Sequence, residues 1–125
     1  ALGDTQGVVN AWGLLAHLNF LWRDFDAVRS ACREGDALQP GFGAPYEGLV
    51  LREEGRFAEA LPLLEARVRR AEGRGRRHRS AAYGFDLGLT LHGLGDLEGA
   101  WSRCEGSLRA FWEMGEMATL ARVLD

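Results

Sequence analysis

The chain has no lysine, no isoleucine and only two asparagines, so all 15 of its basic residues are arginine. The missing residue types are those with AT-rich codons, and we therefore expect a bacterial source with a GC-rich genome. Long apolar runs are missing too, since none approaches the roughly 18 residues of a membrane span, and we expect no membrane partner. The 125 residues are 46% hydrophobic and 26% charged, which is ordinary for one soluble domain and excludes a disordered or collagen-like chain.

Cysteine is scarce, with only Cys32 and Cys104 in the chain. Both stand seven residues after an apolar anchor, Phe25 or Leu97, and the matching position of a third segment is Leu64. A position shared with leucine indicates the core, where a free thiol behaves as a small hydrophobe. We therefore expect two unpaired structural thiols and a cytoplasmic location, because disulfides are rare in reducing compartments.

Motifs that would carry chemistry are absent from the sequence. There is no Cys-x2-Cys or His-x3-His spacing for zinc, no Gly-x-Ser-x-Gly frame and no Gly-Lys-Ser/Thr phosphate loop. The neighbouring carboxylates Glu53 and Glu54 precede a turn and are expected to be solvated. The sequence therefore predicts no catalytic residue, no cofactor and no metal ion, and a chain that is not an enzyme.

What the sequence does contain is an internal repeat. Three segments align without gaps, at residues 24–28, 56–60 and 96–100. The second residue of each is a large apolar anchor that a smaller apolar residue follows three positions later; the anchors are Phe25, Phe57 and Leu97, which are 32 and then 40 residues apart. Apolar residues continue after each anchor at helical spacing, and another helix-like stretch precedes it. Each repeat is therefore predicted to be two helices joined at a tight turn.

This pattern predicts seven helices, near residues 5–22, 24–38, 42–54, 56–72, 77–94, 96–113 and 116–124. Three aspartates, Asp4, Asp24 and Asp96, stand where helix N-caps belong. Glycines within the predicted helices indicate close contact between helix backbones, at Gly48, Gly84, Gly88 and Gly99. The tryptophans are expected mostly in the core or between repeats, with Trp112 available to an interface; they are Trp12, Trp22, Trp101 and Trp112.

The sequence resembles tetratricopeptide repeats, whose pattern is W-x2-L-G-x2-Y…A-x3-F…P with a period of roughly 34 residues. Trp12 and Leu15 match this pattern in the first repeat, Pro40 falls at its closing proline, and Leu87 and Gly88 match in the third. The longer second period is similar to the looser repeats of bacterial signal-responsive transcription regulators.

The resemblance implies an all-α, right-handed superhelical solenoid of antiparallel helix pairs in one domain over residues 1–125. The repeats would span approximately residues 5–40, 41–75 and 76–114, followed by a terminal helix at 116–125. Because the chain has no initiator methionine, we expect it to be a fragment of a longer protein.

Proteins with this repeat bind peptides or proteins on the concave face that the first helices line. The resemblance places there Asn10, His17, Phe20, Phe42, Leu49, Arg52, Phe85, Leu89 and His92. That set is largely apolar, which favours an apolar segment or a helix of a partner. The implied function is a non-catalytic protein–protein interaction or regulatory scaffold module, with self-association through the terminal helix as its simplest version. An alternative is a sensor domain that responds to a small molecule.

Positive charge is concentrated in one run, while the rest of the chain is net acidic. The run holds one glutamate and seven arginines: Arg67, Arg69, Arg70, Arg74, Arg76, Arg77 and Arg79. It is interpreted as a solvated turn, as a contact for an acidic partner, or as a contact for nucleic-acid phosphates. No aromatic residue interleaves the run, which weighs against single-stranded nucleic acid, and the acidity of the remainder weighs against a duplex.

Overall fold

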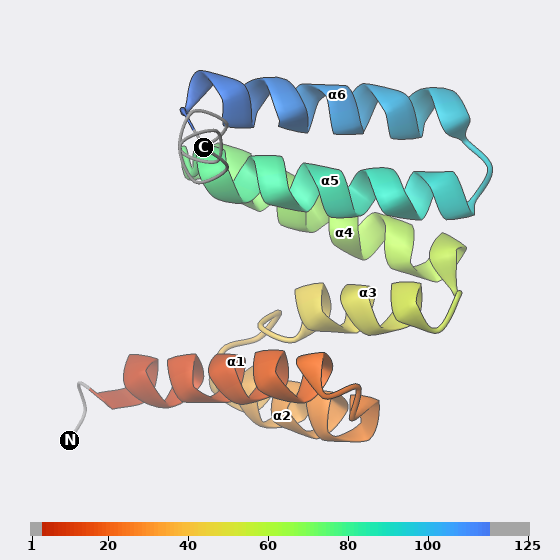
Figure 1. The fold of residues 1–125 in the computed structure, drawn as a ribbon. Helices are drawn as coiled ribbons and strands as arrows, with labels where there is room; N and C mark the ends of the chain where they lie inside the picture. Colours follow the sequence, from red (N-terminus) through yellow and green to blue (C-terminus); the bar gives the residue numbers. More distant parts are fainter. Residues whose placement is uncertain (1–3, 116–125) are drawn as a thin grey trace, which may run out of the picture. The chain divides into compact units, whose positions relative to one another are not determined.

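The computed structural model describes residues 4–115, which form six α-helices and no strand (Figure 1). The helices are α1 (Thr5–Leu21), α2 (Phe25–Leu38), α3 (Ala44–Glu53), α4 (Phe57–Gly73), α5 (Arg77–Gly93) and α6 (Leu97–Glu113). The all-α prediction is confirmed, and the first six predicted helices match these six closely. The seventh, predicted at 116–124, lies outside the described residues.

Four of the five connections between these helices are three residues long and share one geometry. In each, the middle residue has a positive φ: Arg23 (62°), Gly55 (79°), Gly75 (66°) and Gly95 (83°). At the end of α5, for example, the Gly95 and Asp96 amides donate to carbonyls of the last helical turn, both at 3.0 Å. This is the Schellman arrangement, in which a left-handed residue closes a helix. Glycine adopts that conformation without a Cβ penalty, so the glycines mark where the helices end.

The side chains of Asp24 and Asp96 cap the N-termini of α2 and α6, which are the second helices of two hairpins. Asp24 Oδ1 accepts a hydrogen bond from the Ala27 amide at 3.1 Å, and Asp96 Oδ1 accepts one from the Gly99 amide at 2.9 Å. These two predicted N-caps are confirmed, whereas Asp4 stands at the N-cap of α1 without a capping bond from its side chain. The role predicted for Gly99 is wrong, because a Cβ there would lie 2.5 Å from Asp96 Oδ2, so that glycine accommodates the cap.

The chain divides into two compact units, Ala1–Leu63 and Leu64–Asp125, and the division falls within α4. Pro62 lies just before it and lacks the amide hydrogen that would continue the helical ladder. Among the described residues, no helix has both the length and the apolar character needed to cross a bilayer.

The first unit packs the α1–α2 hairpin and α3 around a core of small apolar residues that aromatic side chains border. Its core holds Ala16, Val28, Ala31, Cys32 and Val50, against which Trp12, Phe20, Phe25 and Tyr46 pack. The Phe42 ring lies directly over Gly35, where a side chain would collide with it. The core positions predicted for Cys32 and Trp12 are confirmed, Trp12 as a partly buried residue at the edge of that core.

The second unit joins α5 to α6 through small residues. A Cβ added at Gly84 would lie 2.9 Å from Ser107 Oγ, and one at Gly88 would lie 2.8 Å from Cys104 Sγ and 3.3 Å from the Ala100 carbonyl oxygen. With no larger side chain between them, the two helices approach closely, since the distance between packed helices follows the residues at their contact. The predicted role of Gly84 and Gly88 is therefore confirmed.

Candidate functional site

Among the described residues, helix α5 presents an exposed apolar face, and that face carries three of the residues predicted to bind a partner. Phe85, Leu89 and His92 are spaced four and then three residues apart, which places them on one side of the helix. Phe85 is 47% exposed and Leu89 is 44% exposed, and His92 is exposed as well. Large apolar side chains therefore stand in solvent at the positions where the repeat pattern predicts binding.

Helix α6 carries a second exposed apolar stripe, made by Leu97, Trp101, Leu108 and Trp112. Their spacing of four, seven and four residues keeps them on one side of the helix. Trp101 is 73% exposed and Trp112 is 68% exposed, and in the first unit Trp22 is 77% exposed. The predicted core or packing position is therefore wrong for Trp22 and Trp101, whereas Trp112 is exposed, as a residue available to an interface has to be. On α6 the reason is that small residues already fill the contact with α5.

The faces of α5 and α6 adjoin each other. The His78 ring contacts the Phe111 ring edge-on, with centroids 5.4 Å apart. His78 lies seven residues before Phe85 on the same side of α5. Phe111 lies three residues after Leu108 and therefore beside the exposed stripe of α6. We call the combined area the α5–α6 surface; it consists of Phe85, Leu89, Leu97, Trp101, Leu108 and Trp112. Clustered exposure of this kind differs from the scattered single residues of ordinary surfaces and marks interaction sites.

The arginine run does not act as one group. The Arg67 guanidinium lies 3.6 Å from the centroid of the Tyr83 ring and 3.3 Å from Asp86 Oδ2, so this arginine packs α4 against α5. Arg69 lies 3.9 Å from Glu65, and Arg77 lies 3.1 Å from Glu113. The other four arginines, Arg70, Arg74, Arg76 and Arg79, are exposed.

Exposed positive charge therefore gathers at the turn between α4 and α5. The Arg77–Glu113 ion pair joins the beginning of α5 to the end of α6. Glu113 directly follows Trp112, so the arginine-rich turn lies at the Trp112 end of the α5–α6 surface.

In the first unit, the predicted partner-binding residues are divided between solvent and interior. Asn10 and His17 are exposed on one side of α1, whereas Leu49 is buried. Phe20 packs on the core with its ring 6.0 Å from Phe25. The remaining two are half-buried: the Phe42 ring lies 5.7 Å from Tyr46, and the Arg52 guanidinium lies 3.0 Å from Glu53. Packing within the unit therefore occupies most of these side chains.

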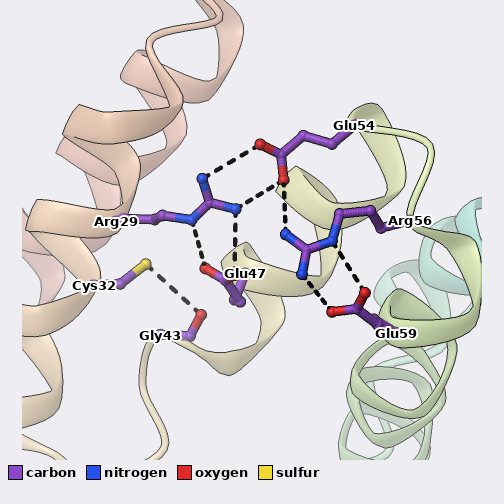
Figure 2. Close-up of polar contacts among 7 residues, drawn as sticks. All are labelled: Arg29, Cys32, Gly43, Glu47, Glu54, Arg56 and Glu59. Carbon is purple, nitrogen blue, oxygen red and sulfur yellow. Dashed lines mark hydrogen bonds and ion pairs between the residues drawn. The ribbon is translucent and has the colours of Figure 1, made fainter.

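A network of ion pairs holds α3 against α2 (Figure 2). Arg29 of α2 donates to Glu47 at 3.3 Å and to Glu54 at 2.8 Å, so it contacts both ends of α3. Arg56 continues the network, 3.7 Å from Glu54 and 2.6 Å from Glu59. The expectation that Glu54 is merely solvated is therefore wrong.

These contacts shift the acidity of the groups involved. The hydrogen bond from Arg29 lowers the pKa of Glu54. Burial by itself would raise the pKa of Glu53, but hydrogen bonds from Arg23 and Arg52 outweigh it and the pKa lies below its usual value. Both carboxylates are therefore ionised at neutral pH.

An open depression of about 400 Å³ lies beside this network, and its lining includes Arg29, Cys32, Asp36, Gly43 and Glu47. The protein itself uses these polar groups: the Cys32 thiol contacts the Gly43 carbonyl oxygen at 3.7 Å, and Asp36 accepts the Gly43 amide at 2.8 Å. Burial raises the pKa of Cys32 to about 11, so the thiol is a poor nucleophile. Within residues 4–115, no three histidine, cysteine, aspartate or glutamate side chains gather as they would around a metal ion.

No family model matches the chain, and neither a curated protein nor a solved structure matches it. The α6 stripe is the candidate site that sequence reasoning missed. A signal for it exists, because the apolar residues of 97–113 cover two adjacent sides of the helix. Ala100 lies on one and Trp101 on the other, whereas a helix buried on one side needs a single apolar face.

Proposed function

We propose that the chain is a tetratricopeptide-like helical-repeat module that binds another protein and carries no catalytic activity. Two features support the proposal: the same three-residue Schellman turn recurs four times, and the α1–α2 and α5–α6 hairpins each bring two successive helices together. The solenoid arrangement of helix pairs, the cytoplasmic location and a role within a bacterial regulator belong to this proposal.

The observation that carries the binding function is the α5–α6 surface. It presents six large apolar side chains to solvent on two adjoining helices. Such a surface is costly to leave exposed, at about 25 cal/mol for each Å² of apolar area. A partner that covers it removes this cost, and Trp101 and Trp112 are of the residue type most enriched among energetic hot spots.

The chemistry of the surface indicates the kind of partner. An amphipathic helix can place its apolar face along the α5–α6 surface, as in helix-in-groove recognition. The exposed arginines at one end, Arg70, Arg74, Arg76 and Arg79, favour a partner segment with acidic residues at the corresponding end. The positive electrostatic field of these arginines accelerates association with an acidic partner and makes the association rate depend on the salt concentration.

The test is capture of partners from host lysate at low salt, with and without nuclease, identified by mass spectrometry. The bait is compared with the double variant Phe85→Ser/Leu89→Ser and with the control Leu38→Ser, which removes an exposed leucine of α2. We expect one protein set that survives nuclease, persists with the control and is lost with the double variant. A protein set that all three baits capture equally would contradict the proposal.

The other two interpretations predict different outcomes of the same experiment. If nuclease removes all captured material, and Arg70→Gln/Arg76→Gln abolishes capture, the arginine-rich turn binds phosphates. If the bait captures nothing but metabolites raise its melting temperature saturably, the module senses a small molecule.

A further inference from the structure

Helix α1 has apolar side chains on two opposite sides, and only one of them is used within the first unit. Val9, Gly13 and Ala16 are buried. On the other side, Leu14 is 59% exposed, and Leu18 and Leu21 are exposed with it. The helix contains no aspartate, glutamate, lysine or arginine from Thr5 to Leu21. A cluster of exposed apolar side chains marks an interaction site, and the described residues of the first unit leave the outer side of α1 uncovered.

The residues along this outer side follow a coiled-coil spacing. Gly7, Ala11, Leu14, Leu18 and Leu21 are separated alternately by four and three residues, which is the repeat of a helix–helix seam. Val8, Leu15 and Trp22 flank the seam at intervals of seven and are exposed too. We call these eight residues the α1 seam. A single helix of the same spacing would fit along it.

Side-chain size along the seam is graded. The residues at its N-terminal end, Gly7 and Ala11, are small and exposed, and the last three are leucines. Gly7 has no role inside the unit, because a Cβ there would meet nothing within 4 Å, whereas Gly13 makes room for Tyr46 and Phe42. The open space beside Gly7 and its place on the line of the seam leave room there for a large side chain from outside the unit.

We propose that α1 pairs with α1 of a second copy of this chain in an antiparallel, two-fold symmetric dimer. Antiparallel pairing sets the leucines of each helix against Gly7 and Ala11 of the other, so large residues face small ones as in well-packed cores. Parallel pairing would set leucine against leucine at one end and leave a void at the other. No charged group of α1 opposes its counterpart, and the two-fold axis closes the assembly at two chains.

The dimer is independent of the proposed partner surface, because the seam lies in the first unit and the α5–α6 surface in the second. A 17-residue helix is only about 25 Å long, so the pair lies at the small end of specific interfaces. We expect a dissociation constant in the micromolar range. Sedimentation velocity on the whole chain from about 1 to about 200 µM covers that range.

The decisive variants are Leu14→Glu and Leu14→Arg, since Leu14 is the middle residue of the seam. The wild type is expected to rise with concentration from 13.8 kDa to twice that mass. Each variant alone brings two like charges together, and we expect its dimerisation to weaken by roughly tenfold or more. Mixing the two variants restores the dimer, because the introduced carboxylate of one chain then faces the introduced guanidinium of the other. Only pairing of the seam with itself has this property. Circular dichroism confirms that each variant is folded.

A second comparison separates pairing from helix stability. Gly7→Leu raises the helix propensity of α1 but fills the position that receives a leucine from the second copy, and we expect it to weaken the dimer. Gly106→Ala is the matched control, because that helical glycine of α6 also has open space around it, and it leaves the dimer unchanged. The proposal is overturned if the wild type stays monomeric, if assembly continues beyond two chains, or if the Leu14 mixture fails to pair. Capture through Phe85 and Leu89 tests the partner function separately.

Discussion

The two units use the same hairpin turn but opposite distributions of side-chain size. In the first unit, the half-buried rings of Phe42 and Tyr46 pack within the unit, and the glycines Gly13 and Gly35 make room for them. In the second unit, glycine makes room for the neighbouring helix itself, and the tryptophans of α6 stand outside. Glycine within a helix therefore has two uses here: it makes room for an aromatic ring, or it lets the small residues of a neighbouring helix approach closely. In the second case, the large apolar side chains are left for another surface.

The most direct test of this difference is to replace one tryptophan in each unit by alanine. Trp12→Ala removes a ring that packs on the core of the first unit, and we expect a loss of about 3 kcal/mol in the free energy of unfolding. Trp101→Ala removes a ring that is mostly in solvent, and we expect a change within about 0.5 kcal/mol. Urea unfolding followed by circular dichroism measures both. Equal losses would show that the rings of the two units are equally packed.

Two glycine substitutions test whether each glycine makes room for a neighbouring helix or for an aromatic side chain. Gly88→Val forces α5 away from Cys104 and the Ala100 carbonyl oxygen, and we expect a loss of about 2 kcal/mol because α6 cannot yield locally. Gly13→Ala brings a Cβ to 3.3 Å from the hydroxyl of Tyr46, a side-chain atom that can shift. The helix propensity gained, about 1 kcal/mol, then offsets most of its cost. A larger loss at Gly13 than at Gly88 would reverse this assignment.

Acid unfolding measures how much the ion pairs of the first unit contribute to its stability. The pKa values of Glu53 and Glu54 are lowered in the folded chain. As the pH falls below the unfolded value of about 4.3, the unfolded state takes up protons first, so these contacts lose their stabilising effect. We expect Glu54→Gln to reduce the free energy of unfolding at neutral pH. We also expect that free energy to depend less on pH below about 5. The control Glu34→Gln, at an exposed position of α2, should change neither.

The smallest expected effect concerns the two free thiols. Cys32 is buried with its pKa raised to about 11, while Cys104 of α6 is half-buried. At about pH 8.5, alkylation of the native chain should label Cys104 roughly tenfold faster or more. Mass spectrometry of the labelled peptides measures the ratio. Faster labelling of Cys32 would mean that the first unit opens more readily than the second.

Sequence reasoning succeeded where the signal is local. The apolar spacing of the repeats predicted the six described helices, and Asp24 and Asp96 were correctly predicted as caps. It failed for Trp22 and Trp101, because a tryptophan on a helix looks the same in sequence whether or not another element covers it. Of the candidate site, the Phe85, Leu89 and His92 face was predicted from the repeat pattern, and the α6 stripe was not.

The helices, their turns and the small residues between α5 and α6 can be derived from the sequence, because these depend on backbone conformation and on spacing within a few turns. Which apolar faces are covered depends on the packing of the folded chain. That packing placed Leu49 in the interior, left Phe85 in solvent, engaged Arg67 with Tyr83 and Asp86, and joined Arg29 to Glu47 and Glu54. Each of these outcomes depends on which residues distant in the chain come into contact, and the periodicity of one helix carries no information about its neighbour.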